Sequence, residues 1–127
     1  MKIESFNAPS APQPTGGYAQ ICEVSGATRL AFVSGQTPAD ADGKVPASFA
    51  EQSRLIWSNI EAQLAQAGMS LDNVVKATTF LSDRKYAIEN RAIRSQVMGA
   101  RTPAITVVIC GIFDEAWLLE IEVIAAA

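Results

Sequence analysis

The chain has 127 residues, a net charge of -3, 49% hydrophobic residues and 18% charged residues. This length is typical of one domain, so we expect a single domain over residues 1–127. The acidic sequence pI of 4.9 argues against nucleic-acid binding, which relies on a basic surface. No histidine is present, and Cys22 and Cys110 have no metal-binding spacing, which excludes Ser-His-Asp and Cys-His catalysis and histidine-ligated metals.

The hydrophobic content is high for so small and weakly charged a chain, which favours burial of extra surface in an oligomer. No stretch approaches the roughly 20 apolar residues that span a bilayer, and the first residues lack the apolar core of a signal peptide. We therefore expect a cytoplasmic protein with reduced thiols and no membrane partner. The one basic cluster is interpreted as a solvated helix face rather than an RNA patch; it comprises Arg84, Lys85, Arg91, Arg94 and Arg101.

The first half of the chain predicts three strands and a helix. A short strand at "KIES" precedes a loop over residues 7–17, where three prolines and two glycines interrupt regular structure. The segments "YAQICEV" and "RLAFVSG" predict two strands joined by the short loop "SGAT". Residues 48–67 predict a helix, with Ser48 and Glu51 at capping-box spacing and Gly68 as its stop. Its predicted stripe comprises Phe49, Gln52, Ile56, Ile60, Gln63 and Ala67, widened by Leu55 and Leu64.

The second half predicts a strand, a helix and two further strands. β-branched residues in "NVVKATTFL" favour a strand, and Asp83 is placed to cap a helix that runs to about Met98. The stripe of this helix comprises Tyr86, Asn90, Ile93 and Val97. Residues 104–110 and 118–125 are the last two predicted strands. The order indicates a layered α/β (α+β) fold, in which both helices pack on one face of the sheet. The other face should then be buried in a closed homo-oligomer, with sites at the subunit seams.

The last strand carries two glutamates, Glu120 and Glu122. Side chains two residues apart in a strand share a face, so both should point away from the apolar set Leu119, Ile121 and Val123, which belongs under the helices. A partly buried carboxylate must find a donor or a cation. Either each glutamate pairs with an arginine or a backbone N–H of a neighbouring subunit, or Glu120 is a general acid or base for a bound water.

Several segments together resemble the Rid/YjgF family of reactive-intermediate deaminases. They are "GGYAQ" (16–20), "SGQTP" (34–38), "VVKATTFLSD" (74–83), "PAITVV" (103–108) and "LLEIEVIA" (118–125). The match runs in order through nearly the whole chain. The resemblance implies a chorismate-mutase-like fold, a mixed sheet with two helices on one face, and a homotrimer with three small-molecule clefts between subunits. It also implies cofactor-independent hydrolysis of enamines and imines, such as 2-aminoacrylate, to keto acids and ammonia.

Site residues follow from the same resemblance. Tyr18 matches a tyrosine that lines the cleft, and Gly35 matches a backbone position beside the ligand. Asn90 matches an asparagine of the second helix, which accounts for a polar residue on its apolar stripe. Glu120 matches the glutamate that orients or activates the attacking water, whereas Glu122 is interpreted as structural.

Position 105 departs from the family pattern. Active deaminases of the family have the pattern P-A-R-[ST] here, and their arginine binds the substrate carboxylate. This chain instead has "PAIT", with Ile105 in place of the arginine. A charge-assisted hydrogen bond is worth about 1.5–3 kcal/mol, so its loss should weaken binding about tenfold to a hundredfold. Ile105 would favour a neutral, ring-bearing or longer ligand. Arg101, in the preceding loop, is a candidate to replace the missing arginine.

Three functions remain open from the sequence. The first is an imine or enamine deaminase with an altered substrate preference, and the second is a non-catalytic trimer that binds a small metabolite. The third, RNA cleavage, is disfavoured because the chain has no histidine and no basic stretch interleaved with aromatic residues.

Overall fold

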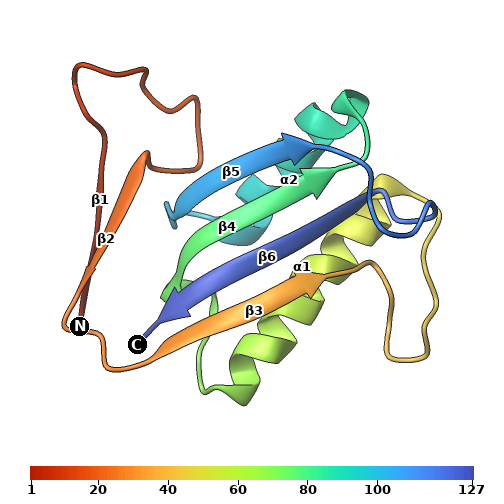
Figure 1. Cartoon of the computed structure of the whole chain (residues 1–127), viewed down its shortest axis with the longest axis horizontal. Coiled ribbons are helices and arrows are strands. Elements are labelled where there is room, and N and C mark those ends of the chain that lie inside the picture. Colours follow the sequence, from red (N-terminus) through yellow and green to blue (C-terminus); the bar gives the residue numbers. More distant parts are fainter.

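The computed structural model describes residues 1–127 and consists of a four-stranded sheet with two helices on one face (Figure 1). The order across the sheet is β3 (Leu30–Gln36), β6 (Leu119–Ala126), β4 (Val74–Leu81) and β5 (Ala104–Ile109). Strand β6 is antiparallel to both neighbours, and β4 is parallel to β5. Helix α1 (Phe49–Gln66) connects β3 to β4, and α2 (Ala87–Met98) connects β4 to β5. This arrangement confirms the predicted mixed sheet with both helices on one face.

The first two strands, β1 (Lys2–Phe6) and β2 (Ile21–Ser25), form a separate antiparallel hairpin at the side of the main sheet (Figure 1). The hairpin lies against the start of β5, where the Ala19 N–H donates to the Pro103 carbonyl over 3.2 Å. Strands β2 and β3 were predicted from adjacent segments, and both are confirmed. They do not pair, because the N–H groups of Thr28 and Arg29 between them donate to the carbonyl of Ala127.

Helix α1 begins and ends where its sequence predicts, but the capping box is only half formed, because the Glu51 carboxylate accepts from the Ser48 hydroxyl instead of the Ser48 N–H. The Ser48 hydroxyl accepts a hydrogen bond from the Glu51 N–H over 3.2 Å, and Gly68 follows the helix with a φ of 68°. The predicted stripe is largely confirmed, but Gln63 is exposed and Trp57 is buried instead. No helix has the length and apolar composition needed to cross a bilayer.

The prediction that Asp83 caps the second helix was wrong. Its Oδ1 atom accepts from the Lys85 N–H in a 3₁₀ turn, η2 (Arg84–Tyr86), and α2 begins after this turn without a side-chain cap. The predicted stripe is confirmed, and the ring of Tyr86 stacks on Phe49 of α1 with centroids 4.7 Å apart. The prediction of a solvated basic face was wrong for Arg94, which is buried. Arg94 follows Asn90 by four residues, so it lies on the same side of the helix as that buried stripe.

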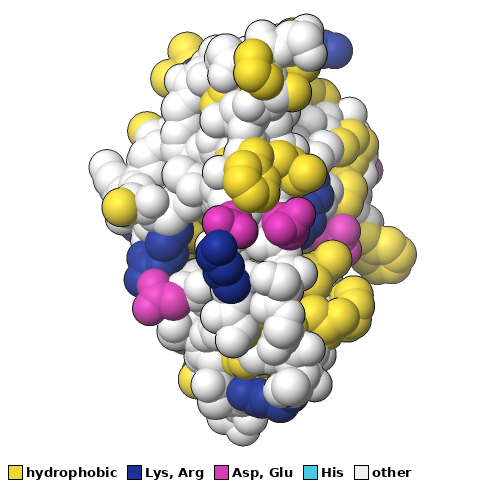
Figure 2. Space-filling view, turned by 90° about the vertical axis from the view of Figure 1, so that its left-hand side faces the viewer, with side chains coloured by type: hydrophobic (Ala, Val, Ile, Leu, Met, Phe, Trp, Pro, Cys, Tyr) yellow, Lys and Arg dark blue, Asp and Glu magenta, His cyan; other side chains and the backbone are white.

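One hydrophobic core lies between the helices and the sheet. Leu119, Ile121 and Val123 of β6 are almost fully buried in it, whereas Glu120 and Glu122 alternate with them and point to the other face, as predicted. That second face carries no helix and leaves Phe32 72% exposed. Seen from the hairpin side, acidic side chains form a band with hydrophobic side chains on both sides of it (Figure 2). The burial of the open face against other copies stays a prediction.

A buried glutamine ties α1 to the segment that leads into β6. The side-chain amide of Gln52 donates to the carbonyls of Pro46 over 2.8 Å and Ala116 over 3.0 Å, and its Oε1 atom accepts from the Leu118 N–H over 2.8 Å. Gln52 is almost fully buried, so these partners replace the water that it loses on folding. This cross-link holds Leu118, the residue immediately before β6 and two residues before Glu120.

We expect Gln52→Met to lower the free energy of unfolding by about 2–4 kcal/mol, because three backbone groups lose their partner while the side-chain volume is nearly kept. The matched control, Gln63→Met, lies exposed on the same helix and should change stability by no more than about 0.5 kcal/mol. Urea denaturation of all three proteins at one protein concentration measures the difference. Equal stability of the two variants would contradict the structural role of Gln52.

Candidate functional site

A cavity of about 310 Å³ opens between α2 and the outer edge of β5. Three of the residues predicted for the site line it: Tyr18, Asn90 and Ile105. They come from three different elements, namely the segment before β2, the second helix and the fifth strand. These three side chains line one cavity although they are 15 to 87 residues apart along the chain, and their roles in a functional site stay a prediction.

Each of these three residues is held by ordinary secondary structure. Tyr18 is positioned by its neighbour Ala19, which is buried and bridges to Ala104 at the start of β5. Asn90 is held by α2 on its buried side. Ile105 pairs with Ala77 of β4, so its side chain points to the helix-covered face and packs against the edge of the core. The isoleucine thus forms an apolar wall of the cavity.

The cavity also contains two arginines of α2, Arg91 and Arg94. Arg94 is only 4% exposed, yet its side chain makes no ion pair or hydrogen bond within the chain, and its Nε atom is buried without a partner. Its guanidinium carbon lies 6.0 Å from the centre of the Tyr18 ring. Burial lowers the pKa of Arg94 below its ordinary value, the charge of Arg91 lowers it further, and Tyr18 acts in the opposite direction. Arginine nevertheless remains charged at neutral pH.

The remaining predicted residues, Gly35 and Glu120, lie together on the other face of the sheet. A bulge in the pairing of β3 with β6 contains Gly35, and a Cβ atom there would lie 2.8 Å from the Cδ atom of Glu120. Glu120 pairs with Phe80 and borders a small cavity of about 130 Å³, which Cys110 also lines. The lack of a side chain at residue 35 is therefore what leaves room for the Glu120 carboxylate.

Within one chain, the five predicted site residues thus form two groups separated by the sheet. Tyr18, Asn90 and Ile105 meet on the helix-covered face, whereas Gly35 and Glu120 meet on the open face. Glu122 is exposed beside the second group and pairs with Thr78. A single chain does not bring the glutamate to the cavity.

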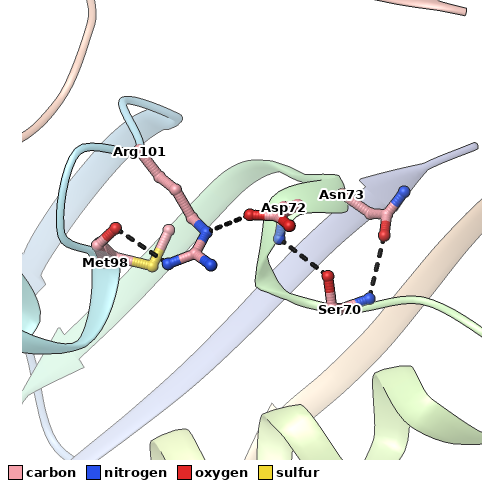
Figure 3. A network of polar contacts seen from close by, with 5 residues as sticks. All are labelled: Ser70, Asp72, Asn73, Met98 and Arg101. Carbon is pink, nitrogen blue, oxygen red and sulfur yellow. Dashed lines mark hydrogen bonds and ion pairs between the residues drawn. The ribbon is translucent and has the colours of Figure 1, made fainter.

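Arg101, considered as a substitute for the missing cation, is engaged elsewhere (Figure 3). Its Nε atom forms an ion pair with Asp72 over 2.7 Å, and its Nη1 atom donates to the Met98 carbonyl over 3.2 Å. Asp72 belongs to the 3₁₀ turn η1 (Leu71–Asn73), which Ser70 caps. Arg101 does not line the 310 Å³ cavity and links η1 to the end of α2 instead.

Arg94 is the residue that the sequence interpretation missed. It was grouped with the exposed basic residues of the same segment, which share its charge. The signal that identifies it is spacing, because it lies one helical turn beyond Asn90 on a stripe already predicted to be buried. A cation on the buried side of a helix calls for a partner, and none is supplied within the chain.

The two-layer arrangement, with two helices on one face of a mixed sheet, is a chorismate-mutase-like fold. Residues 8–127 match the family described as Endoribonuclease L-PSP. A RutC family protein of Pyrococcus abyssi is 35% identical over 127 residues, which cover 98% of each chain. The chain therefore belongs to the Rid/YjgF family.

Two further comparisons concern a named activity and the fold. The Escherichia coli protein named "Putative reactive intermediate deaminase TdcF" is 34% identical over 82 residues, which cover 64% of this chain and 59% of that protein. The crystal structure of YyfB from Yersinia pestis, described as a Rid-family protein of unknown function, superposes with a TM-score of 0.86. It covers 100% of both chains at 20% identity and so supports the fold alone.

We expect Gly35→Ala to displace the Glu120 carboxylate, because the added methyl group and the carboxylate cannot occupy the same space. The cost in unfolding free energy should be about 1 kcal/mol, the typical penalty for forcing a side chain off its rotamer. In the background of Glu120→Ala the same substitution should cost nothing further, since the clashing atoms are gone. Gly111→Ala, where a Cβ meets nothing within 4 Å, is the control. Additive effects in urea denaturation would contradict the contact.

Proposed function

We propose that the protein is a homotrimeric imine and enamine deaminase whose clefts lie between subunits. In each cleft, Tyr18, Asn90 and Ile105 of one copy would face Gly35 and Glu120 of the next. The observation that carries this proposal is the separation of the two groups by the sheet, because a site that needs both can form only where two copies meet. The open sheet face, with Phe32 exposed, offers the apolar surface for such contact.

The proposed chemistry needs only water and a carboxylate. An enamine first becomes an imine when a proton moves from its nitrogen to carbon. The Glu120 carboxylate then takes a proton from water while the water oxygen bonds to the imine carbon, and the glutamic acid gives this proton to the nitrogen as the C=N π electrons move to it. Glu120 next transfers the hydroxyl proton of this intermediate to the amine nitrogen, so that the C–N bond breaks, ammonia leaves and the carbonyl forms. Imine and water thus yield a ketone or keto acid and ammonia without any oxidant.

The family assignment and the name of the Escherichia coli relative support this reaction class. The apolar wall at Ile105 supports a preference for larger imino acids over 2-aminoacrylate, because an isoleucine offers a short substrate carboxylate neither charge nor donor. The alternative is a trimer that binds a small metabolite without turnover. It is favoured by one observation, namely that no carboxylate, lysine or histidine lines the cavity of a single chain.

Mixing two inactive variants tests the shared cleft. We expect Asn90→Ala and Glu120→Gln each to abolish acceleration of imine hydrolysis, the first by losing substrate placement and the second by losing the base. Unfolded together in equal amounts and refolded, they should recover about a quarter of the parent activity, because about one cleft in four combines an intact cavity with an intact glutamate. Ammonia release above the spontaneous rate is the measurement. A refolded mixture without activity, beside an active parent treated likewise, would contradict a cleft shared between copies.

Substituting position 105 tests the proposed preference. With imines generated in situ, we expect Ile105→Arg to raise the rate on 2-aminoacrylate, relative to the imine of leucine, by about tenfold to a hundredfold. Ile88→Arg makes the same charge change on an exposed site of α2 and should leave this ratio unchanged. Should the parent already prefer 2-aminoacrylate, the altered-preference account is wrong. Binding of imino-acid analogues without any turnover would favour the metabolite-binding alternative.

A further inference from the structure

Arg94 poses an electrostatic problem that one chain does not solve. Fully buried charged side chains are rare unless they are paired, because removal from water is costly. Arg94 is 4% exposed and has no carboxylate, carbonyl or hydroxyl partner within the chain. By contrast, Arg29 donates to the Ala67 carbonyl, Arg54 donates to Gln96, and Arg101 pairs with Asp72. The Tyr18 ring, 6.0 Å from the guanidinium carbon, attracts the charge but offers the guanidinium no acceptor atom in its face, so the missing hydrogen-bond acceptor is a group that enters from outside the chain.

The surroundings of Arg94 define the charge of that group. The 310 Å³ cavity contains a second cation, Arg91, and none of its lining residues is acidic. Two positive charges in a partly buried hollow create a potential that is screened less than at an open surface and attracts an anion. A planar guanidinium binds a carboxylate with two parallel hydrogen bonds, which fixes the orientation of the bound group.

The rest of the wall defines the body of the ligand. Ile105, Val107 and Ala87 make part of the cavity apolar, so they favour a hydrocarbon portion beside the anionic group. The Oδ1 atom of Asn90 is buried and has no donor, so it is free to accept a hydrogen bond from an N–H or O–H of the ligand. Inorganic phosphate has the required negative charge but no apolar group that could contact the apolar wall.

We propose that Arg94 binds the carboxylate of a small organic acid with an apolar side chain, so that helix α2 supplies the cation that the fifth strand lacks at Ile105. The identification of this acid as a substrate rests on the proposed deaminase function, whereas its binding does not. This proposal also explains why Asn90 is a polar residue on the buried side of α2. It lies one turn from Arg94 and would accept a hydrogen bond from a donor of the ligand next to the carboxylate. The ligand enters with its carboxylate toward the helix and its apolar portion along β5.

Calorimetry with two probes of matched shape tests the proposal. 4-Methylpentanoate carries a carboxylate, and 4-methylpentanamide has the same shape without the charge. We expect the acid to bind the parent more tightly than the amide does, and Arg94→Met to weaken the acid about tenfold to a hundredfold while leaving the amide unchanged. Arg84→Met removes an exposed arginine outside the cavity and should bind both probes like the parent. Arg94→Lys keeps the charge but loses the planar guanidinium that makes two parallel hydrogen bonds. Its affinity for the acid should therefore fall less than that of Arg94→Met.

The stability of the ligand-free protein separates binding from a structural role. Because Arg94 has no partner within the chain, Arg94→Met should unfold at the same temperature as the parent or a higher one, and only the stabilisation by 4-methylpentanoate should be lost. Light scattering of the same samples should show an unchanged assembly. Dissociation of Arg94→Met would mean that a carboxylate of a neighbouring copy is the partner, and would overturn the proposal.

Four other results would overturn the proposal as well. Three concern the parent, namely that it does not bind the acid, that it binds acid and amide equally, or that it binds inorganic phosphate as tightly as the acid. The fourth is that Arg94→Met binds the acid as tightly as the parent does. The proposed deaminase function fails separately. If Arg94 binds the acid but no imine is hydrolysed faster, the binding site stands without the enzyme. If turnover is unaffected in Arg94→Met, the enzyme stands without this role for Arg94.

Discussion

The structure depends on one strand, β6, which lies in the middle of the sheet and is covered by helices on one face only. Hydrogen bonds to β3 and β4 on either side fix its register, so its alternate residues have no freedom to exchange faces. Leu119, Ile121 and Val123 complete the core, and the same alternation directs Glu120 to the open face. The packing of the core and the position of the candidate base are therefore set by a single periodicity.

Periodicity also explains which features could be predicted from the sequence. The two helices, the Ser48 cap of α1 and the faces of β6 follow from spacing, which is local information, and they agree with the structure, whereas Asp83 caps η2 instead of α2. The burial of Arg94 was missed because its charge suggested exposure, although its spacing from Asn90 indicated the opposite. The separation of Glu120 from Tyr18 by the sheet depends on which strands become neighbours. That order is set by long-range pairing, which no local pattern contains.

In the proposed site, the cation that binds the ligand comes from the helix rather than from the strand. The helix and the strand edge face each other across the same hollow, so a cation on either element reaches the same space. In this chain the strand contributes Ile105 and the helix contributes Arg94. An anion held from the helix approaches the hollow from a different direction than one held from the strand.

The central position of β6 also affects how the protein folds. β6 follows β3 and β4 in the sequence but lies between them in the sheet, so β3 has no neighbour in this sheet until β6 is in place. Leu30 of β3 pairs with Ala126, a contact between residues far apart in sequence, and such pairings form slowly. Until β6 joins the sheet, the apolar sides of both helices have no completed sheet to pack against. Folding intermediates without β6 therefore expose apolar surface, which favours aggregation.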